Sequence, residues 1–191
     1  MAVRSVYVSE GEYLQAERQA SAKSEYLAGQ VFAMAGASIE HAAITLNIAA
    51  ELLRQIRHKG CHVYAQDVRV KVTPASAYFY PDVVVVCGTP QVAGEQRDTL
   101  LNPVLIVEVL SPSTEEFDRG EKFFAYQKLD SLREYLLVSQ DRVHVEQFVR
   151  QADGLWQRRE YTQPEQVVQL ESVGAVLPLR AVYEGVVLPS S

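Results

Sequence analysis

Tyr80-Pro81-Asp82-Val83-Val84-Val85-Val86-Cys87 and Pro103-Val104-Leu105-Ile106-Val107-Glu108-Val109-Leu110 are two apolar runs that each contain one carboxylate. A continuous apolar run of this length is typical of a β-strand that is covered on both faces. An ionised carboxylate in such a strand costs several kcal/mol unless it is paired, protonated or bound to a metal. Asp82 and Glu108 are therefore the first candidate site residues.

Antiparallel pairing of these strands would place Asp82 beside Glu108, because the start of 83–87 would lie next to the end of 104–110. Two neighbouring carboxylates supply the hard oxygen ligands that Mg²⁺ and Mn²⁺ prefer. A metal site is therefore expected here. Two simpler interpretations stay open: Asp82 as a turn carboxylate after Pro81, and Glu108 as a member of a buried ion pair.

The surrounding sequence predicts a mixed α/β fold, in which helices pack on a sheet. Ser9-Glu10-Gly11-Glu12 is a capping box that predicts a short helix. Ser38 precedes apolar residues at helical spacing, which predicts a long helix that ends before Gly60. The further predicted elements are a turn at 25–29, strands at 30–35, 61–72, 134–138, 143–149 and 155–161, helices at 9–20 and 115–129, a loop at 88–102, and a closing helix at 177–183.

Length and composition limit the class of protein. The 191 residues predict one domain, and 48% apolar residues supply an ordinary globular core. No apolar run reaches the ~18 residues of a membrane helix, and residues 1–7 lack the apolar stretch of a signal peptide, so a cytoplasmic protein without membrane contact is expected. Cys61 and Cys87 are expected to be buried, reduced thiols.

The net charge of −6 argues against sequence-independent coating of nucleic acid by the whole surface, because that mode of binding relies on many Lys and Arg side chains. A local basic cleft remains compatible with this charge. An acidic excess also fits a protein that gathers carboxylates around a divalent cation, although solvated surface acids are its commoner cause.

Pro81-Asp82 followed by Glu108 on an apolar strand resembles the PD-(D/E)XK nuclease superfamily. About residues 9–188 resemble the Uma2 family of restriction-endonuclease-like proteins. The segments that carry this resemblance are Glu25-Tyr26 before Gly29, Ala33-Met34-Ala35-Gly36 before His41, Tyr80-Pro81-Asp82, Pro103 with Val107 to Thr114, Asp118 before Lys122 before Tyr126, and Glu134 to Val138. The resemblance implies a restriction-endonuclease-like core of a helix, a three-stranded meander, a helix and a further strand, followed here by extra C-terminal strands.

The resemblance fails at one position, because Glu108-Val109-Leu110 has leucine where the superfamily motif has lysine. In proteins that resemble this one the cationic role is assigned to the following helix, where Lys122 matches. Asp118, Lys122 and Tyr126 are spaced to share one helix face. The alternatives are an ordinary Asp–Lys helix pair, worth ~0.2–0.5 kcal/mol, and Lys71 as the acting lysine.

Two weaker candidates complete the expected site. The resemblance implies that Glu25 joins the acids from the N-terminal side, although a carboxylate after a helix is usually only solvated. His41 lies in the first turn of the long predicted helix, where a packing role is commoner than a site role. As a site residue it is expected to contact a substrate phosphate.

These features together predict metal-assisted hydrolysis of phosphodiester bonds in DNA. Asp82, Glu108 and the Val109 carbonyl are expected to hold Mg²⁺ or Mn²⁺, which would activate a water molecule. Lys122 is expected to stabilise charge on the phosphate, with Glu25 orienting the nucleophile. Cutting two strands from one face needs two sites, which favours a homodimer.

Two other classes of function compete with this one. A nuclease-like fold that no longer cuts could act as a nucleic-acid-binding or assembly module, and the net acidity and the missing strand lysine favour it. A small-molecule enzyme using the same acids has less support, because the sequence has no glycine-rich phosphate loop.

Overall fold

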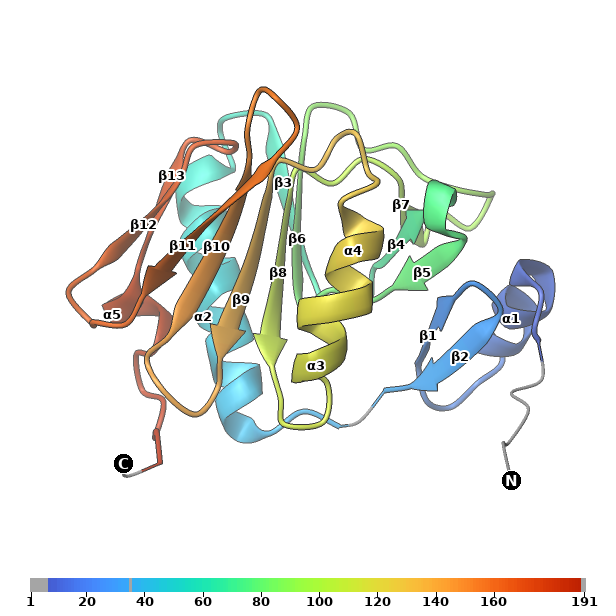
Figure 1. The fold of residues 1–191 in the computed structure, drawn as a ribbon, viewed down its shortest axis with the longest axis horizontal. Coiled ribbons are helices and arrows are strands. Elements are labelled where there is room, and N and C mark those ends of the chain that lie inside the picture. Colours follow the sequence, from blue (N-terminus) through green and yellow to red (C-terminus); the bar gives the residue numbers. More distant parts are fainter. Residues whose placement is uncertain (1–6, 35, 190–191) are drawn as a thin grey trace.

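The computed structural model describes residues 7–34 and 36–189, and its centre is a six-stranded sheet with helices on both faces (Figure 1). The strand order is β11-β10-β9-β8-β6-β3, and neighbours are antiparallel except for the parallel pair β8–β9. The strands are β3 (Cys61–Ala65), β6 (Val83–Cys87), β8 (Leu105–Leu110), β9 (Glu134–Ser139), β10 (Val145–Arg150) and β11 (Trp156–Tyr161).

The register of β6 and β8 confirms the predicted antiparallel pairing. Val83 lies opposite Val107 and Val85 opposite Leu105, so the chain before β6 meets the end of β8. Side chains alternate between the two faces of a strand. Leu105, Val107 and Val109 join the core on one face, whereas Ile106 and Leu110 join the core on the other. Glu108 therefore belongs to the second face.

The first face is covered by α2 (Ile39–Ile56), as the helical spacing predicts. Its buried residues Ile44, Ile48, Leu52 and Ile56 recur every four positions and pack on the sheet. The Ser38 side chain accepts a hydrogen bond from the His41 N–H at 3.0 Å, which begins the helix beside the end of β8.

The C-terminal segment covers the same face beside α2. It forms a hairpin of β12 (Val167–Leu170) and β13 (Ala175–Pro178), followed by the one-turn helix α5 (Leu179–Val182). The prediction of a helix over 177–183 is therefore wrong at its start. Leu177 and Pro178 continue the hairpin because Leu177 pairs with Val168 and is buried.

The second face is covered by a helical segment in three parts. It comprises α3 (Glu115–Phe117), a π-helical turn (Asp118–Lys122) and α4 (Phe123–Tyr126). The sequence predicted one regular helix over 115–129. A π-helical turn has i→i+5 hydrogen bonds in place of i→i+4, occurs as a short bulge inside helices, and is frequent at functional sites.

A second sheet stands beside the first, with the order β2-β1-β5-β4-β7 (Figure 1). Its strands are β1 (Ser24–Leu27), β2 (Gln30–Ala33), β4 (Arg69–Val72), β5 (Ala77–Phe79) and β7 (Thr99–Leu100), with a 3-10 turn at Thr73–Ala75. The predicted turn at 25–29 is thus mostly strand, with the reversal at Ala28 and Gly29. β7 lies within the predicted loop at 88–102.

The predicted single strand at 61–72 is divided between the two sheets. Gln66 has φ +60°, which turns the chain after β3 so that β4 enters the second sheet.

At the N-terminal end, the capping box is confirmed, because Ser9 and Glu12 bond reciprocally at the start of α1 (Glu10–Glu17). The helix is shorter than the predicted 9–20. Ala35, the last residue of the predicted strand at 30–35, lies outside the described residues.

Cys61 and Cys87 lie directly opposite each other in β3 and β6 and form a disulfide. The prediction of reduced thiols is therefore wrong, because strand pairing brings together two residues that are 26 positions apart.

Within residues 7–34 and 36–189, no helix is long and apolar enough to cross a membrane. Residues 1–6, on which most of the signal-peptide argument depends, lie outside the described residues.

Candidate active site

A cavity of about 730 Å³ lies between the two sheets, the start of α2 and the π-helical turn. Every residue that the sequence predicts for the site contributes to its wall: Glu25, His41, Asp82, Glu108, Val109 and Lys122. Four parts of the central fold (α2, the start of β6, β8 and the π-helical turn) and β1 of the second sheet thus meet at the edge where β6 begins and β8 ends.

Lys122 is the buried centre of this cavity. Its ammonium lies 2.9 Å from Glu25 Oε1, 3.0 Å from Glu108 Oε1 and 3.2 Å from Asp118 Oδ1. Only 4% of Lys122 is exposed. Burial alone would lower the pKa of Lys122, but the charges of its three carboxylate neighbours outweigh burial and hold the pKa well above its ordinary value. The ammonium is therefore charged at every physiological pH.

Glu108 projects from β8 toward the same helical segment. Its Oε1 meets Lys122 and accepts a hydrogen bond from the Tyr126 hydroxyl at 3.3 Å. Burial raises the pKa of Glu108 well above its ordinary value, against the opposing charge of Lys122, and the other acids of the cavity raise it further. Without an additional cation the site thus favours protonation of this carboxyl.

Glu25 reaches the cavity from β1 in the second sheet. Its Oε1 accepts a hydrogen bond from the Tyr80 N–H at 2.9 Å and also meets Lys122. Burial raises the pKa of Glu25 even though the charge of Lys122 lowers it. This carboxylate is therefore buried and paired, and the solvated alternative considered for Glu25 is wrong.

Asp82 connects β6, β8 and α2. Its Oδ2 accepts a hydrogen bond from the Val109 N–H at 2.7 Å and lies 3.3 Å from Nε2 of His41. Burial lowers the pKa of His41, but the hydrogen bond and charge of Asp82 outweigh burial and raise the pKa overall. The Nδ1 atom of His41 is buried without a hydrogen-bond partner among the described residues.

Negative charge exceeds positive charge in this cavity. Its four carboxylates belong to Glu25, Asp82, Glu108 and Asp118, whereas Lys122 and His41 are the basic side chains in contact with them. Even with Glu108 protonated and His41 charged, the three remaining carboxylates outnumber these two bases, and Lys23, which also lines the wall, pairs with Asp67 outside it. Carboxylate and carbonyl oxygens are the preferred ligands of Mg²⁺ and Mn²⁺, so the donor set of Asp82, Glu108 and the Val109 carbonyl fits such an ion.

Asp118 and Tyr126 were not predicted as site residues, although both contact the predicted ones. Their spacing of four residues on either side of Lys122 carried the signal. Lys71, the alternative lysine, lies outside the cavity wall, and its Nζ pairs with Glu10 Oε2 at 3.0 Å. The geometry therefore favours Lys122 over Lys71.

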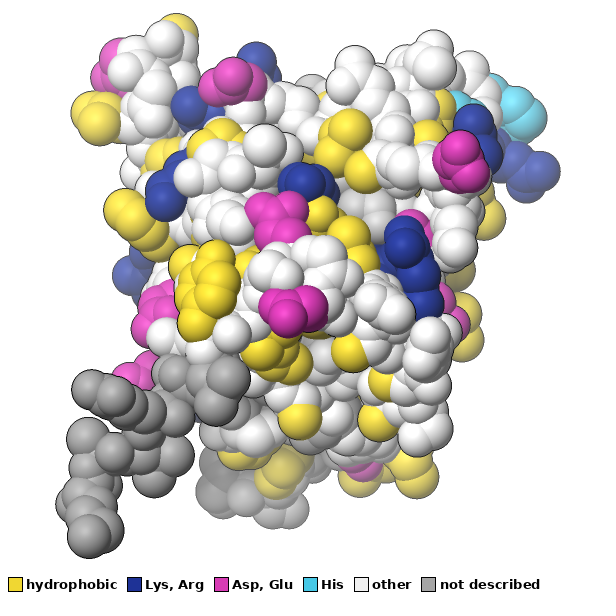
Figure 2. Space-filling model, turned by 90° about the vertical axis from the view of Figure 1, so that its right-hand side faces the viewer, with side chains coloured by type: hydrophobic (Ala, Val, Ile, Leu, Met, Phe, Trp, Pro, Cys, Tyr) yellow, Lys and Arg dark blue, Asp and Glu magenta, His cyan; other side chains and the backbone are white. Residues whose placement is uncertain are grey.

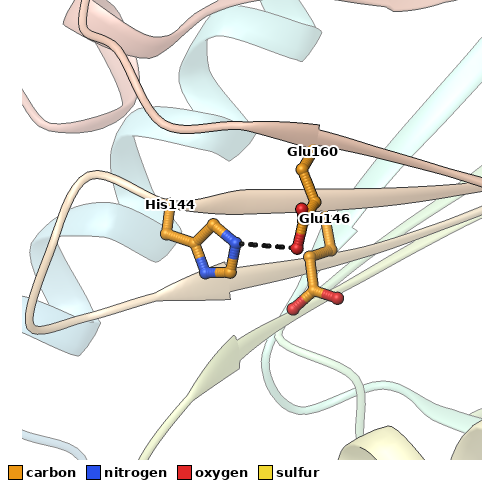
Figure 3. A group of neighbouring side chains, drawn as sticks. All are labelled: His144, Glu146 and Glu160. Carbon is orange, nitrogen blue, oxygen red and sulfur yellow. Dashed lines mark ion pairs between the residues drawn. The ribbon is translucent and has the colours of Figure 1, made fainter.

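A second group of titratable side chains lies on β10, β11 and the turn before β10. The possible ligand atoms of His144, Glu146 and Glu160 lie within 4.8 Å of one another, and no other such trio occurs in the described part of the chain. His144 Nε2 lies 3.5 Å from Glu160 Oε1, and Figure 3 shows this ion pair with the Glu146 carboxylate beside it.

Arginines already compensate the acids of this group. Arg158 pairs with both Glu146 and Glu160, and Arg119 pairs with Glu146. These arginines hold the pKa of Glu146 below its ordinary value, although burial opposes them. Because Arg119 is the neighbour of Asp118, the ion pair fastens the π-helical turn to β10. This group therefore holds the π-helical turn in place beside the cavity and does not form a second candidate site.

The comparisons with known proteins identify the family and agree with this fold. A family model described as "Uma2: Putative restriction endonuclease" matches residues 11–180. Two uncharacterized proteins of Synechocystis sp. (strain ATCC 27184 / PCC 6803 / Kazusa) are similar. The protein sll1609 is 37% identical, with 76% of this chain and 82% of the relative covered, and slr1290 is 34% identical, with 93% and 92% covered.

A solved structure shares the architecture. It is the crystal structure of a putative nuclease belonging to DUF820 from Anabaena variabilis ATCC 29413, with a TM-score of 0.78 and 16% identity over 94% of this chain and 99% of that one. A likeness at this identity shows the fold alone. It confirms the predicted mixed α/β, restriction-endonuclease-like fold.

Proposed function

We propose, on the premise that this chain belongs to the Uma2 family of putative restriction endonucleases, that it cleaves phosphodiester bonds in DNA with the help of a divalent cation. The observation that carries the proposal is the buried ammonium of Lys122, which lies among three carboxylates in a cavity that also contains Asp82. A structural ion pair needs one acid for each base, whereas this cluster has a surplus of acids beside an open cavity.

The excess of carboxylates in the cavity favours the binding of a cation there. Asp82, Glu108 and the Val109 carbonyl would hold Mg²⁺ or Mn²⁺, because they are the oxygen donors at the junction of β6 and β8. When bound, the cation supplies Lewis acidity to the phosphate and to the attacking water. The added positive charge also lets Glu108 ionise in spite of its burial.

Lys122 supplies fixed positive charge to the reacting phosphate. Its three acidic neighbours keep it protonated and hold its position, so its stabilisation of the developing negative charge requires no reorganisation. Glu25, held by the Tyr80 N–H, orients the attacking water. His41, with its pKa raised by Asp82 against the effect of burial, donates a hydrogen bond to a phosphate oxygen.

The face around β1 and β2 supports local rather than general contact with DNA. Figure 2 shows Lys and Arg side chains interleaved with Asp and Glu side chains on this face. Together with the net charge of −6, this pattern favours recognition through the cavity and its rim over coating of the duplex.

The proposal is tested by incubating the purified chain with supercoiled plasmid DNA in Mg²⁺ or Mn²⁺, with EDTA as the metal-free arm. Glu108→Gln is expected to abolish metal-dependent cleavage. Glu134→Gln is the matched control, because Glu134 is equally buried on the neighbouring strand β9 but does not line the cavity. Wild-type protein that cleaves equally in EDTA, or Glu108→Gln that cleaves like wild type, would contradict the proposal.

A non-cleaving nucleic-acid-binding module is the second candidate. Two observations favour it: Leu110 stands where the superfamily motif has lysine, and the ammonium of Lys122 is already engaged by three carboxylates. This candidate predicts DNA that is retarded on a gel by the wild-type chain and remains intact in Mn²⁺. Cleavage that Glu108→Gln removes excludes it.

A further inference from the structure

The long helix α2 is apolar on the side that faces away from the core as well as on the side that packs on the sheet. Ile39, Ala42, Leu46, Ala50 and Leu53 are exposed and follow one another at intervals of three or four residues. A surface helix ordinarily carries polar residues on its outer side, and a helix that is apolar all round is ordinarily buried. We call this row of five residues the outer stripe.

The apolar surface continues onto the hairpin beside the helix. The Gln55 side chain exchanges hydrogen bonds with the N–H and the carbonyl of Val176, at 2.9 and 2.6 Å, which joins β13 to α2. Val167 and Val176 are exposed, whereas Val168, Ala175 and Leu177 beside them in the strands are buried. With the three large residues of the outer stripe, five of the eleven exposed large hydrophobic side chains in the described residues lie on this one layer.

We infer that this layer is a homodimer interface, in which α2 packs antiparallel against α2 of a second copy around a two-fold axis at Leu46. An antiparallel arrangement brings Ile39 of each copy to Leu53 of the other, since both lie seven residues from Leu46. The alanines between them let two helices approach closely, and a second copy offers the same apolar row. The inference depends on α2 and the hairpin, and it is independent of the catalytic proposal.

Charge supports a second copy in this orientation. Glu40 follows Ile39 in the first turn of α2, and Arg54 follows Leu53 in the last turn, so the two lie on the same flank of the helix. Arg54 already pairs with Glu51 of its own helix at 2.6 Å, and antiparallel packing brings Glu40 of the other copy beside the same guanidinium. It also aligns the helix dipoles favourably.

The hairpin supplies the width that one helix lacks. A stable interface buries about 800 Å² on each partner, and the outer side of α2 is a narrow strip ~27 Å long for 18 residues. Val167 and Val176 extend this strip sideways on the same layer. The proposed interface is therefore the helix together with the hairpin.

The mass of the full chain in solution tests the interface. Sedimentation velocity is expected to give wild-type protein twice the chain mass of 21.3 kDa, and Leu46→Glu the mass of a single chain. Leu155→Glu is the matched control, because Leu46 and Leu155 are each 68% exposed and Leu155 lies at the turn before β11. Wild-type protein that sediments as a monomer at ~100 µM, or Leu46→Glu that stays dimeric, overturns the proposal.

Single cysteine variants test the orientation without a new charge. Leu46→Cys is expected to form an intermolecular disulfide on mild oxidation, because its two copies face each other across the axis. Ile39→Cys alone is expected to stay monomeric on a non-reducing gel, since antiparallel packing separates its two copies by ~21 Å along the helix, beyond the reach of a disulfide. Equal mixing of Ile39→Cys with Leu53→Cys is expected to restore the crosslink. Self-crosslinking of Ile39→Cys, or none in Leu46→Cys, overturns the antiparallel arrangement.

Discussion

The ammonium of Lys122 lies 3.0 Å from the Oε1 atom of Glu108, and both side chains are almost completely buried. The pair connects the π-helical turn to the end of β8, so the distance between the two atoms depends on how the helical segment packs on the sheet. Because Glu25 and Asp118 contact the same ammonium, no single carboxylate neutralises Lys122 alone.

Lys122→Met is expected to lower the stability of the metal-free protein by about 3 kcal/mol, because it leaves three buried carboxylates without their cation. Cleavage is expected to fall ~10²–10³-fold through loss of one electrostatic contact. Urea unfolding and plasmid cleavage measure the two effects. Lys71→Met is the control, because its ion pair with Glu10 lies outside the cavity. Equal losses in the two variants would contradict the role of Lys122.

Divalent cations are expected to stabilise the wild-type chain by RT ln(1 + [L]/Kd), or about 2.7 kcal/mol at ~100-fold excess over Kd. Thermal unfolding in a series of Mn²⁺ concentrations measures this shift, which should vanish in Asp82→Ala. His144→Ala tests the second titratable group and should retain the shift. If the Mn²⁺ shift persists in Asp82→Ala and is lost in His144→Ala, the ion binds at His144, Glu146 and Glu160 instead.

The metal-free protein is expected to lose stability through Glu108 as the pH rises. Burial raises the pKa of Glu108 above the ordinary value of 4.5, so the folded state holds the proton at a pH where the unfolded chain releases it. The contribution is complete below the unfolded pKa and is lost as the pH rises toward the folded pKa. Glu108→Gln removes it, so the wild-type chain should lose more stability than the variant between pH 4.5 and neutral pH. A difference that runs the other way would identify Glu108 as an ionised member of a salt bridge.

His41→Ala is expected to weaken DNA binding more than it slows the chemical step, because its imidazole is placed to contact phosphate. Asp82 raises the pKa of His41 against the effect of burial, so the cation that favours phosphate is lost only as the pH rises through the raised pKa. KM should therefore increase with pH in the wild-type chain and be flatter in the variant. Steady-state cleavage at several pH values measures both. A fall in kcat with KM unchanged would place His41 in the chemical step.

Local patterns predicted the elements that surround the site. The buried runs at 83–87 and 103–110 gave both strands and their antiparallel register, and the spacing after Ser38 gave α2. The i, i+4, i+8 spacing predicted that Asp118, Lys122 and Tyr126 share a helix face, whereas the resemblance singled out Lys122, which lies against Glu108. These patterns are informative because hydrophobic periodicity and capping act within a few residues.

Features that depend on distant parts of the chain were not predicted. Residues 61–72 read as one strand because nothing in their alternation shows that β3 and β4 belong to different sheets. The disulfide of Cys61 and Cys87 follows from strand register, which their spacing in the sequence does not show. Glu25 was placed by resemblance rather than by pattern, because only the pairing of β1 with β5 brings it to the cavity.

Because of the π-helical turn, the positions of Asp118 and Tyr126 depend on the number of residues between them more than on the identity of those residues. Such a turn holds one residue more than an α-helical turn, so deleting a residue there would let the helix close into regular form and rotate one end by ~100° relative to the other. Asp118 or Tyr126 would then leave the cluster, although no site residue had been replaced. Gly120 and Glu121 are exposed and free of these contacts. Relatives of this protein should accept substitutions at these two positions but conserve the number of residues across them.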